Sequence, residues 1–168
     1  IYGTTVDIGA VEYPPLVVDI TADENNGNFS TGDLSLREAI ALANASSNPD
    51  AIIFGGSVFT DATPDIITLG GGELQIRDDV TITGTGMDLL TINGNNASRI
   101  FNVSDFNCST QKTVAISNLT LTGGSANGTS GGGLINVENL TIADVRLTQN
   151  FAQNGGGGIN NFGTMTLV

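Results

Sequence analysis

The chain has 168 residues, with 17 acidic and 5 basic side chains, no histidine, no tryptophan and one cysteine, and its net charge is −12. This balance argues against nucleic-acid binding, because no cluster of lysine and arginine is available to contact phosphates. A zinc site is not expected either, because the chain has no histidine and a single cysteine to serve as the usual ligands. No run approaches the roughly 18 apolar residues of a membrane span, so membrane insertion is not expected.

Residues 1–15 are predicted to be a strand-rich tail or linker, which ends at Pro14-Pro15 because proline interrupts regular structure. Residues 16–50 are predicted to form an N-terminal cap with a helix over 35–45. Ser35 and Glu38 have the spacing of a capping box, in which each side chain accepts a hydrogen bond from the other residue's amide. Apolar residues then recur on one face, which we expect to cover the open interior of the first coil of a solenoid.

The polar loop between residues 21 and 33 offers several oxygen ligands within one short segment. Its candidate calcium ligands are Asp23, Glu24, Asn25 and Asp33. The spacing does not match an EF-hand, and Asx-rich loops also occur as turns that hydrogen-bond their own backbone. Calcium is therefore the single cofactor considered, and the expectation is that the protein needs none.

Residues 51–168 contain short apolar runs that repeat at a regular interval. The pattern at Met87–Asn95 recurs at Ile116–Gly124 and Ile142–Asn150, with offsets of 29 and 26 positions. A second pattern at Gly132–Ile142 recurs at Gly157–Leu167, 25 positions later. Such periods favour a parallel β-helix over an antiparallel sandwich, because stacked coils place like residues on like. The last repeat is unfinished at Val168, so we expect either that the chain is a segment of a longer one or that its bare last coil meets another subunit.

Asparagine and phenylalanine are assigned to the interior and corners of these coils. Asn118 and Asn150 are expected to form a side-chain ladder between successive turns. Core or corner positions are expected for Phe54, Phe59, Phe101, Phe151 and Phe162.

The segment Gly-Asp-Leu-Ser-Leu-Arg-Glu-Ala-Ile-Ala-Leu-Ala-Asn-Ala at 32–45 resembles the bacterial surface proteins named for a Cys-Ser-Leu-Arg-Glu-Ala-Ile motif. The resemblance implies an all-β, right-handed parallel β-helix with a short N-terminal capping helix, similar to polymorphic outer-membrane-protein and autotransporter-passenger repeats. It also implies a secreted or cell-surface location. Phe29 and Leu34 stand where that family commonly has cysteines, so an apolar contact is expected there. The segment 6–12 resembles the motif that closes such β-helices.

Catalysis is not expected from the distribution of charged residues. Glycoside hydrolysis requires two carboxyl groups facing each other across the bond. Asp78 and Asp79 are adjacent, so in a strand they point to opposite faces. Lyase chemistry would use a basic residue, and Lys112 lies in what looks like an inserted loop without an accompanying acidic cluster.

These features predict a non-enzymatic extracellular structural protein, a surface stalk, fibre or filament subunit that associates head to tail with itself or with further β-helix units. The expected interface residues are Ile1, Tyr2, Val6, Ile8, Met165, Leu167 and Val168. The alternatives are a β-helix that binds or cleaves polysaccharide, and an adhesin that binds a host or neighbouring cell. A glycan is thus the other partner considered.

Overall fold

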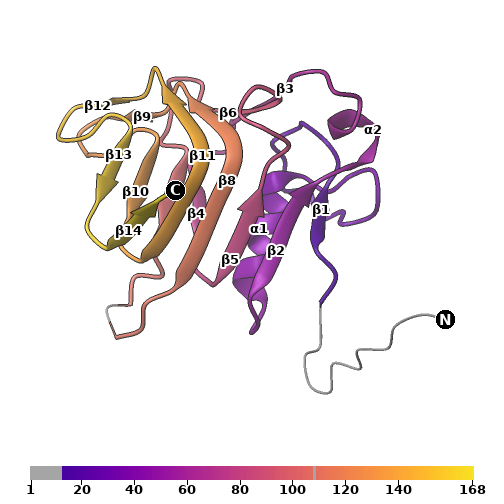
Figure 1. Ribbon diagram of the computed structural model, residues 1–168, viewed down its shortest axis with the longest axis horizontal. Helices are drawn as coiled ribbons and strands as arrows, with labels where there is room; N and C mark the ends of the chain where they lie inside the picture. Colours follow the sequence, from indigo (N-terminus) through magenta and orange to yellow (C-terminus); the bar gives the residue numbers. More distant parts are fainter. Residues whose placement is uncertain (1–12, 108) are drawn as a thin grey trace.

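The computed structural model describes residues 13–107 and 109–168, which form a parallel β-solenoid of about four turns (Figure 1). The predicted β-helix is confirmed. The two helices are α1 (Leu36–Ala45) and α2 (Gly56–Phe59). The strands are β1 (Leu16–Val18), β2 (Asp50–Phe54), β3 (Asp65–Thr68), β4 (Leu74–Ile76), β5 (Val80–Thr83), β6 (Leu90–Asn93), β7 (Phe101–Val103), β8 (Thr113–Thr122), β9 (Ser125–Ala126), β10 (Leu134–Asn136), β11 (Asn139–Thr148), β12 (Phe151–Ala152), β13 (Ile159–Asn161) and β14 (Thr164–Leu167).

Three parallel sheets run along the solenoid. The largest has the order β1-β2-β5-β8-β11-β14, with β6 joining it through β8 and β3 pairing with β6. The second has the order β4-β7-β10-β13, and β9 pairs with β12 in the third. The N-terminal strand β1 and the C-terminal strand β14 therefore lie at opposite ends of one sheet (Figure 1).

The strand register reproduces the offsets of the sequence repeats. Thr91 pairs with Thr120, Ile116 with Ile142, and Leu134 with Ile159, at intervals of 29, 26 and 25 positions. Two longer intervals span the same loop, since Val80 pairs with Val114 34 positions later and Phe101 pairs with Leu134 33 positions later. The extra residues lie in the loop between β7 and β8, which confirms that the segment around Lys112 is an insertion.

Strands β8 and β11 each turn a corner at a residue with positive φ. Asn118 has φ 58° and Asp144 has φ 49°, and the pairs on either side of them remain in register. Asn118 thus lies level with Asp144, and the predicted ladder between Asn118 and Asn150 is wrong. The asparagine ladder in the structure joins Asn136 to Asn161, with a hydrogen bond of 2.7 Å from Nδ2 to Oδ1.

A column of aliphatic side chains runs through the largest sheet from end to end. Its members are paired residue by residue as Leu16, Ile52, Ile82, Ile116, Ile142 and Leu167. The four central members are buried, whereas Leu167 is 67% exposed. The alternation of inward and outward residues therefore supplies the core, as expected for strands with one buried face.

Helix α1 begins directly after its N-cap Ser35, and the predicted capping box with Glu38 is confirmed. Its buried face contacts β1, β2 and β4, so the helix covers the first coil as predicted (Figure 1). The single turn α2 was not predicted. Neither helix is long and apolar enough to cross a membrane, within the residues that the structure describes.

The aromatic residues divide between core and surface. Phe54 and Phe59 pack edge to face with ring centroids 5.3 Å apart, and Phe101 is fully buried. Phe151 and Phe162 are 58% and 70% exposed, so the expectation of core packing is wrong for these two residues.

Candidate functional site

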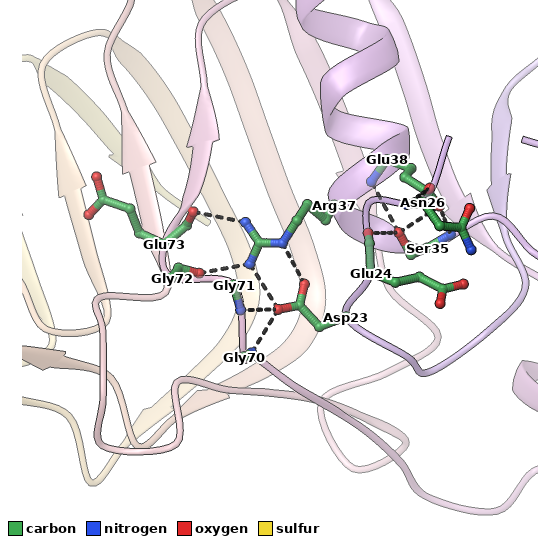
Figure 2. Close-up of polar contacts among 10 residues, drawn as sticks. All are labelled: Asp23, Glu24, Asn26, Ser35, Arg37, Glu38, Gly70, Gly71, Gly72 and Glu73. Atoms are coloured by element: carbon green, nitrogen blue, oxygen red, sulfur yellow. Dashed lines mark hydrogen bonds and ion pairs between the residues drawn. The ribbon is translucent and has the colours of Figure 1, made fainter. Parts of the chain in front are cut away.

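The predicted calcium loop contains an ion pair between Asp23 and the helix residue Arg37 (Figure 2). Arg37 donates from Nε and Nη2 to the two carboxylate oxygens of Asp23 over 2.7 and 2.9 Å. The amides of Gly70 and Gly71 also donate to Asp23, and Arg37 donates to the carbonyls of Gly72 and Glu73. The carboxylate thus joins the cap loop, helix α1 and the turn between β3 and β4.

The surroundings of Asp23 favour its ionised form. Burial by itself raises the pKa of this carboxyl, but the hydrogen bonds from Arg37 and the two glycine amides outweigh burial and hold the pKa below its ordinary value. Both oxygens already accept hydrogen bonds, so Asp23 has the contacts of a structural anchor.

Glu38 anchors the other side of the same loop. Its fully buried carboxylate accepts hydrogen bonds from the amides of Asn26, Gly27 and Ser35 at 2.9, 3.0 and 3.2 Å. Burial alone would raise the pKa of Glu38, but the donors from Ser35, Gly27 and Asn26 outweigh it and lower the pKa. The capping box therefore also fixes the polar loop before the helix.

The remaining calcium candidates do not converge on Asp23. The side chain of Glu24 extends away from the Asp23 carboxylate, and only the carbonyl of Glu24 is engaged, by the Ser35 hydroxyl at 2.8 Å (Figure 2). Asn25 lines a separate cavity beside Arg37, and the Asp33 amide donates to the carbonyl of Ser30. Across residues 13–107 and 109–168, no three His, Cys, Asp or Glu side chains gather as a metal site. Calcium binding remains a prediction.

A second polar centre organises the inserted loop between β7 and β8. The carboxylate of Glu138, only 2% exposed, accepts from the amide of Asp105 at 3.0 Å and from the amide of Lys112 at 2.9 Å. Asn136 orients Glu138, because it accepts from the Glu138 amide and donates to the Glu138 carbonyl. One buried carboxylate therefore clamps both ends of the loop. The sequence carried no signal for this role, since Glu138 lies 26 to 33 positions from its partners.

The charged residues considered for catalysis are engaged with one another or with backbone groups. Lys112 Nζ lies 2.7 Å from Asp78 Oδ1, and Asp79 accepts from the amide of Thr113. Hydrogen bonding to Asp78 and its charge raise the pKa of Lys112, whereas burial opposes that shift. Arg77 lies over the ring of Phe106, with 5.4 Å between the guanidinium carbon and the ring centroid.

The predicted interface residues fall into two groups. Met165 is half-buried, and Leu167 and Val168 are 67% and 82% exposed on the last coil. The other four, Ile1, Tyr2, Val6 and Ile8, lie outside the described residues.

Comparisons with known proteins give no further identification, since neither a family model, nor a curated protein, nor a solved structure matches this chain.

Proposed function

We propose that the chain is a non-enzymatic structural module of a secreted or cell-surface protein, in which copies associate head to tail into a rod. The observation that carries this proposal is the aliphatic column of the largest sheet, which ends in the exposed side chain of Leu167. Extracellular solenoids gain rigidity from coils that hydrogen-bond along a common axis, and each added coil extends the same core.

The last coil has the properties of a surface that accepts another strand. Among the described residues, β14 pairs only with β11, and β13 only with β10. An unpaired strand edge presents free amides and carbonyls to a partner. Burial of the exposed part of Leu167 would add to the hydrophobic free energy at about 25 cal/mol per Å².

The opposite end offers a matching surface. Val17 of β1 and Phe29 are 37% and 51% exposed. They line a cavity of about 370 Å³ together with the apolar side chains of Leu16, Leu34 and Leu42. All pairings in the largest sheet are parallel, so a second copy whose β1 follows β14 would place its Leu16 next in the column after Leu167. Contacts of this heterologous kind repeat without closing and generate a filament.

Charged groups support a structural role over a catalytic one. The carboxylates of Asp23, Glu38 and Glu138 accept hydrogen bonds from backbone amides, and Asp78 is paired with Lys112. Their contacts hold loops in place. The acidic surface fits an exported, highly soluble protein.

Self-association is tested by light scattering after size-exclusion chromatography over a range of protein concentrations, followed by negative-stain electron microscopy. We expect oligomers that lengthen with concentration and lie end to end. Leu167→Asp places a charge in the contact and is expected to give monomers. Thr81→Asp is the matched control, because Thr81 is exposed on β5, which lies between β2 and β8 in the same sheet. A wild-type protein that remains monomeric at millimolar concentration would contradict the proposal.

A further inference from the structure

The inserted loop presents Phe106 to solvent in a backbone conformation that phenylalanine rarely adopts. Its φ is +61° and its side chain is 70% exposed. A bulky residue in this region costs conformational free energy, and such strain persists only where surrounding contacts enforce it. An aromatic ring that contributes little to the core and is held at a cost suggests a role at the surface.

Several hydrogen bonds impose this conformation. The Phe106 amide donates to the Ser104 hydroxyl at 3.1 Å, and the amides on either side of it are held by Glu138 at 3.0 Å and by Asp105 at 2.6 Å. Arg77 lies over the ring. The ring is therefore pre-positioned, which reduces the entropy that a ligand must pay on binding.

A cavity of about 260 Å³ adjoins the ring. Phe106 and Val137 supply apolar walls, while Asn107 and Gln111 carry exposed amide groups. Ser104 and the buried Glu138 complete the lining. Arg77 lies over the ring of Phe106 and does not line the cavity. An apolar wall with a few amide donors and acceptors fits a small ligand that has both an apolar face and hydroxyl groups.

A second exposed ring lies on the same corner of the solenoid. Ser104, Val137 and Phe162 directly follow β7, β10 and β13, which are consecutive strands of one sheet in register. Phe162 is 70% exposed. Two strand spacings of about 4.8 Å separate its coil from that of Phe106. One strand spacing is close to the length of one sugar residue in an extended chain.

The charged groups beside the cavity indicate which ligands of this shape can bind. Glu138 is the one charged residue among those that line the cavity, and the Asp105 carboxylate adjoins it by accepting from the amide of Asn107. Anionic ligands are therefore disfavoured. A cation is disfavoured at the ring itself, because the guanidinium of Arg77 already occupies that position.

We infer that this corner is a binding site for a neutral, extended oligosaccharide that runs along the solenoid axis. A pyranose ring stacks its apolar face on Phe106, with its hydroxyl groups within reach of the Asn107 and Gln111 amides. A residue further along the chain contacts Phe162. The site does not depend on self-association, because its residues belong to one copy.

Saturation-transfer NMR with cellohexaose and chitohexaose as separate probes tests the site on the full chain. We expect transfer to the protons of at least one neutral hexasaccharide, and weaker transfer to a hexamer of galacturonic acid. Absence of transfer to both neutral probes, or a stronger signal from the acidic hexamer, would overturn the inference.

Variants at Phe106 separate binding from folding. Phe106→Gly removes the ring and relieves the positive φ, so we expect an at least tenfold loss of affinity without a fall in Tm. Phe106→Trp keeps an aromatic face and is expected to retain binding. Gln149→Gly is the matched control, because Gln149 is exposed with φ 52° on another loop, and it should leave binding unchanged. Unchanged affinity in Phe106→Gly, or lost affinity in Phe106→Trp, would show that the ring does not form the site.

Discussion

Asp23 and Arg37 form a two-point ion pair that connects the polar loop to helix α1 and, through Arg37, to the turn before β4. The Asp23 side chain is only 3% exposed and that of Arg37 is 17% exposed. Because both side chains are largely buried, solvent screens this ion pair only weakly. Its contribution to stability therefore depends on the geometry of its hydrogen bonds. It fixes the cap on the first coil.

Arg37→Lys is predicted to destabilise the fold although it keeps the charge. Lysine has no planar fork, so it cannot donate to both Asp23 oxygens and to the carbonyls of Gly72 and Glu73 at once. We expect a loss of about 1.5–3 kcal/mol in the free energy of unfolding, measured by urea titration.

The control for this variant is Arg146→Lys. Arg146 and Asp88 form an exposed ion pair at 2.8 Å. Its replacement should change the free energy of unfolding by less than about 1 kcal/mol. Equal losses in the free energy of unfolding of the two variants would mean that the planar guanidinium of Arg37 does not hold the cap on the first coil.

Acid is predicted to destabilise the cap. The folded structure lowers the pKa values of Asp23 and Glu38, because hydrogen bonds to their carboxylates outweigh burial. In acid the unfolded chain therefore binds more protons than the folded one. The stabilisation that the ionised carboxylates of Asp23 and Glu38 give the fold is complete above the ordinary carboxyl pKa of about 4. It is lost as the pH falls through their lowered pKa values. Urea titrations between pH 7 and pH 2 measure this dependence.

The pKa of Asp65 is shifted in the opposite direction, so its ionisation is expected to have the opposite effect on stability. Burial first, and then the charge of Asp61, raise the pKa of Asp65. Its ionised form costs stability at neutral pH, so Asp65→Asn is expected to increase the free energy of unfolding there. A decrease at pH 7, or an acid dependence unchanged in Asp23→Asn, would contradict the assignment of these pKa shifts.

Gly132→Ala is predicted to disrupt the stacking of successive coils. A β-carbon at Gly132 would collide with the Phe151 carbonyl oxygen and lie 2.8 Å from that of Gly157. We expect a loss of about 2–3 kcal/mol, typical of overpacking in a core. Gly158→Ala is the matched control, because its nearest contact would be an ordinary 3.7 Å to Leu147. Thermal unfolding should show a lower Tm for the first variant only.

Asn136→Ala is predicted to weaken both the asparagine ladder and the inserted loop. Asn136 is fully buried, accepts from the Glu138 amide and donates to Asn161 and to the Thr164 carbonyl. Its removal leaves buried polar groups without partners, at a cost of about 2–3 kcal/mol. Asn161→Ala, at the exposed end of the ladder, should cost less. Amide hydrogen exchange would report faster exchange at Asp105 and Lys112 in Asn136→Ala.

The repeats made the coils predictable. Ile116 and Ile142 occupy the same place in two copies of one pattern, and they are paired in the sheet. The ladder between Asn118 and Asn150 was predicted wrongly because the residues are 32 positions apart in sequence, not one coil apart. Residue type alone does not reveal which corner of a coil an asparagine occupies.

The polar contacts depended on segments that meet only after the coils have stacked. Glu138 clamps the loop from Asp105 to Lys112, and nothing in its local sequence distinguishes it from a solvated acid. The exposure of Phe106 and Phe162 likewise depends on the corner at which each coil turns.

The sequence by itself determined the parallel β-solenoid, the spacing of its repeated coils and its capping helix, because periodicity and capping are local and repeat along the chain. Tertiary structure alone decided which carboxylates anchor loops and which rings face solvent. These outcomes follow from contacts between segments that meet only in the folded chain. Glu138, for example, binds amides 26 and 33 positions away.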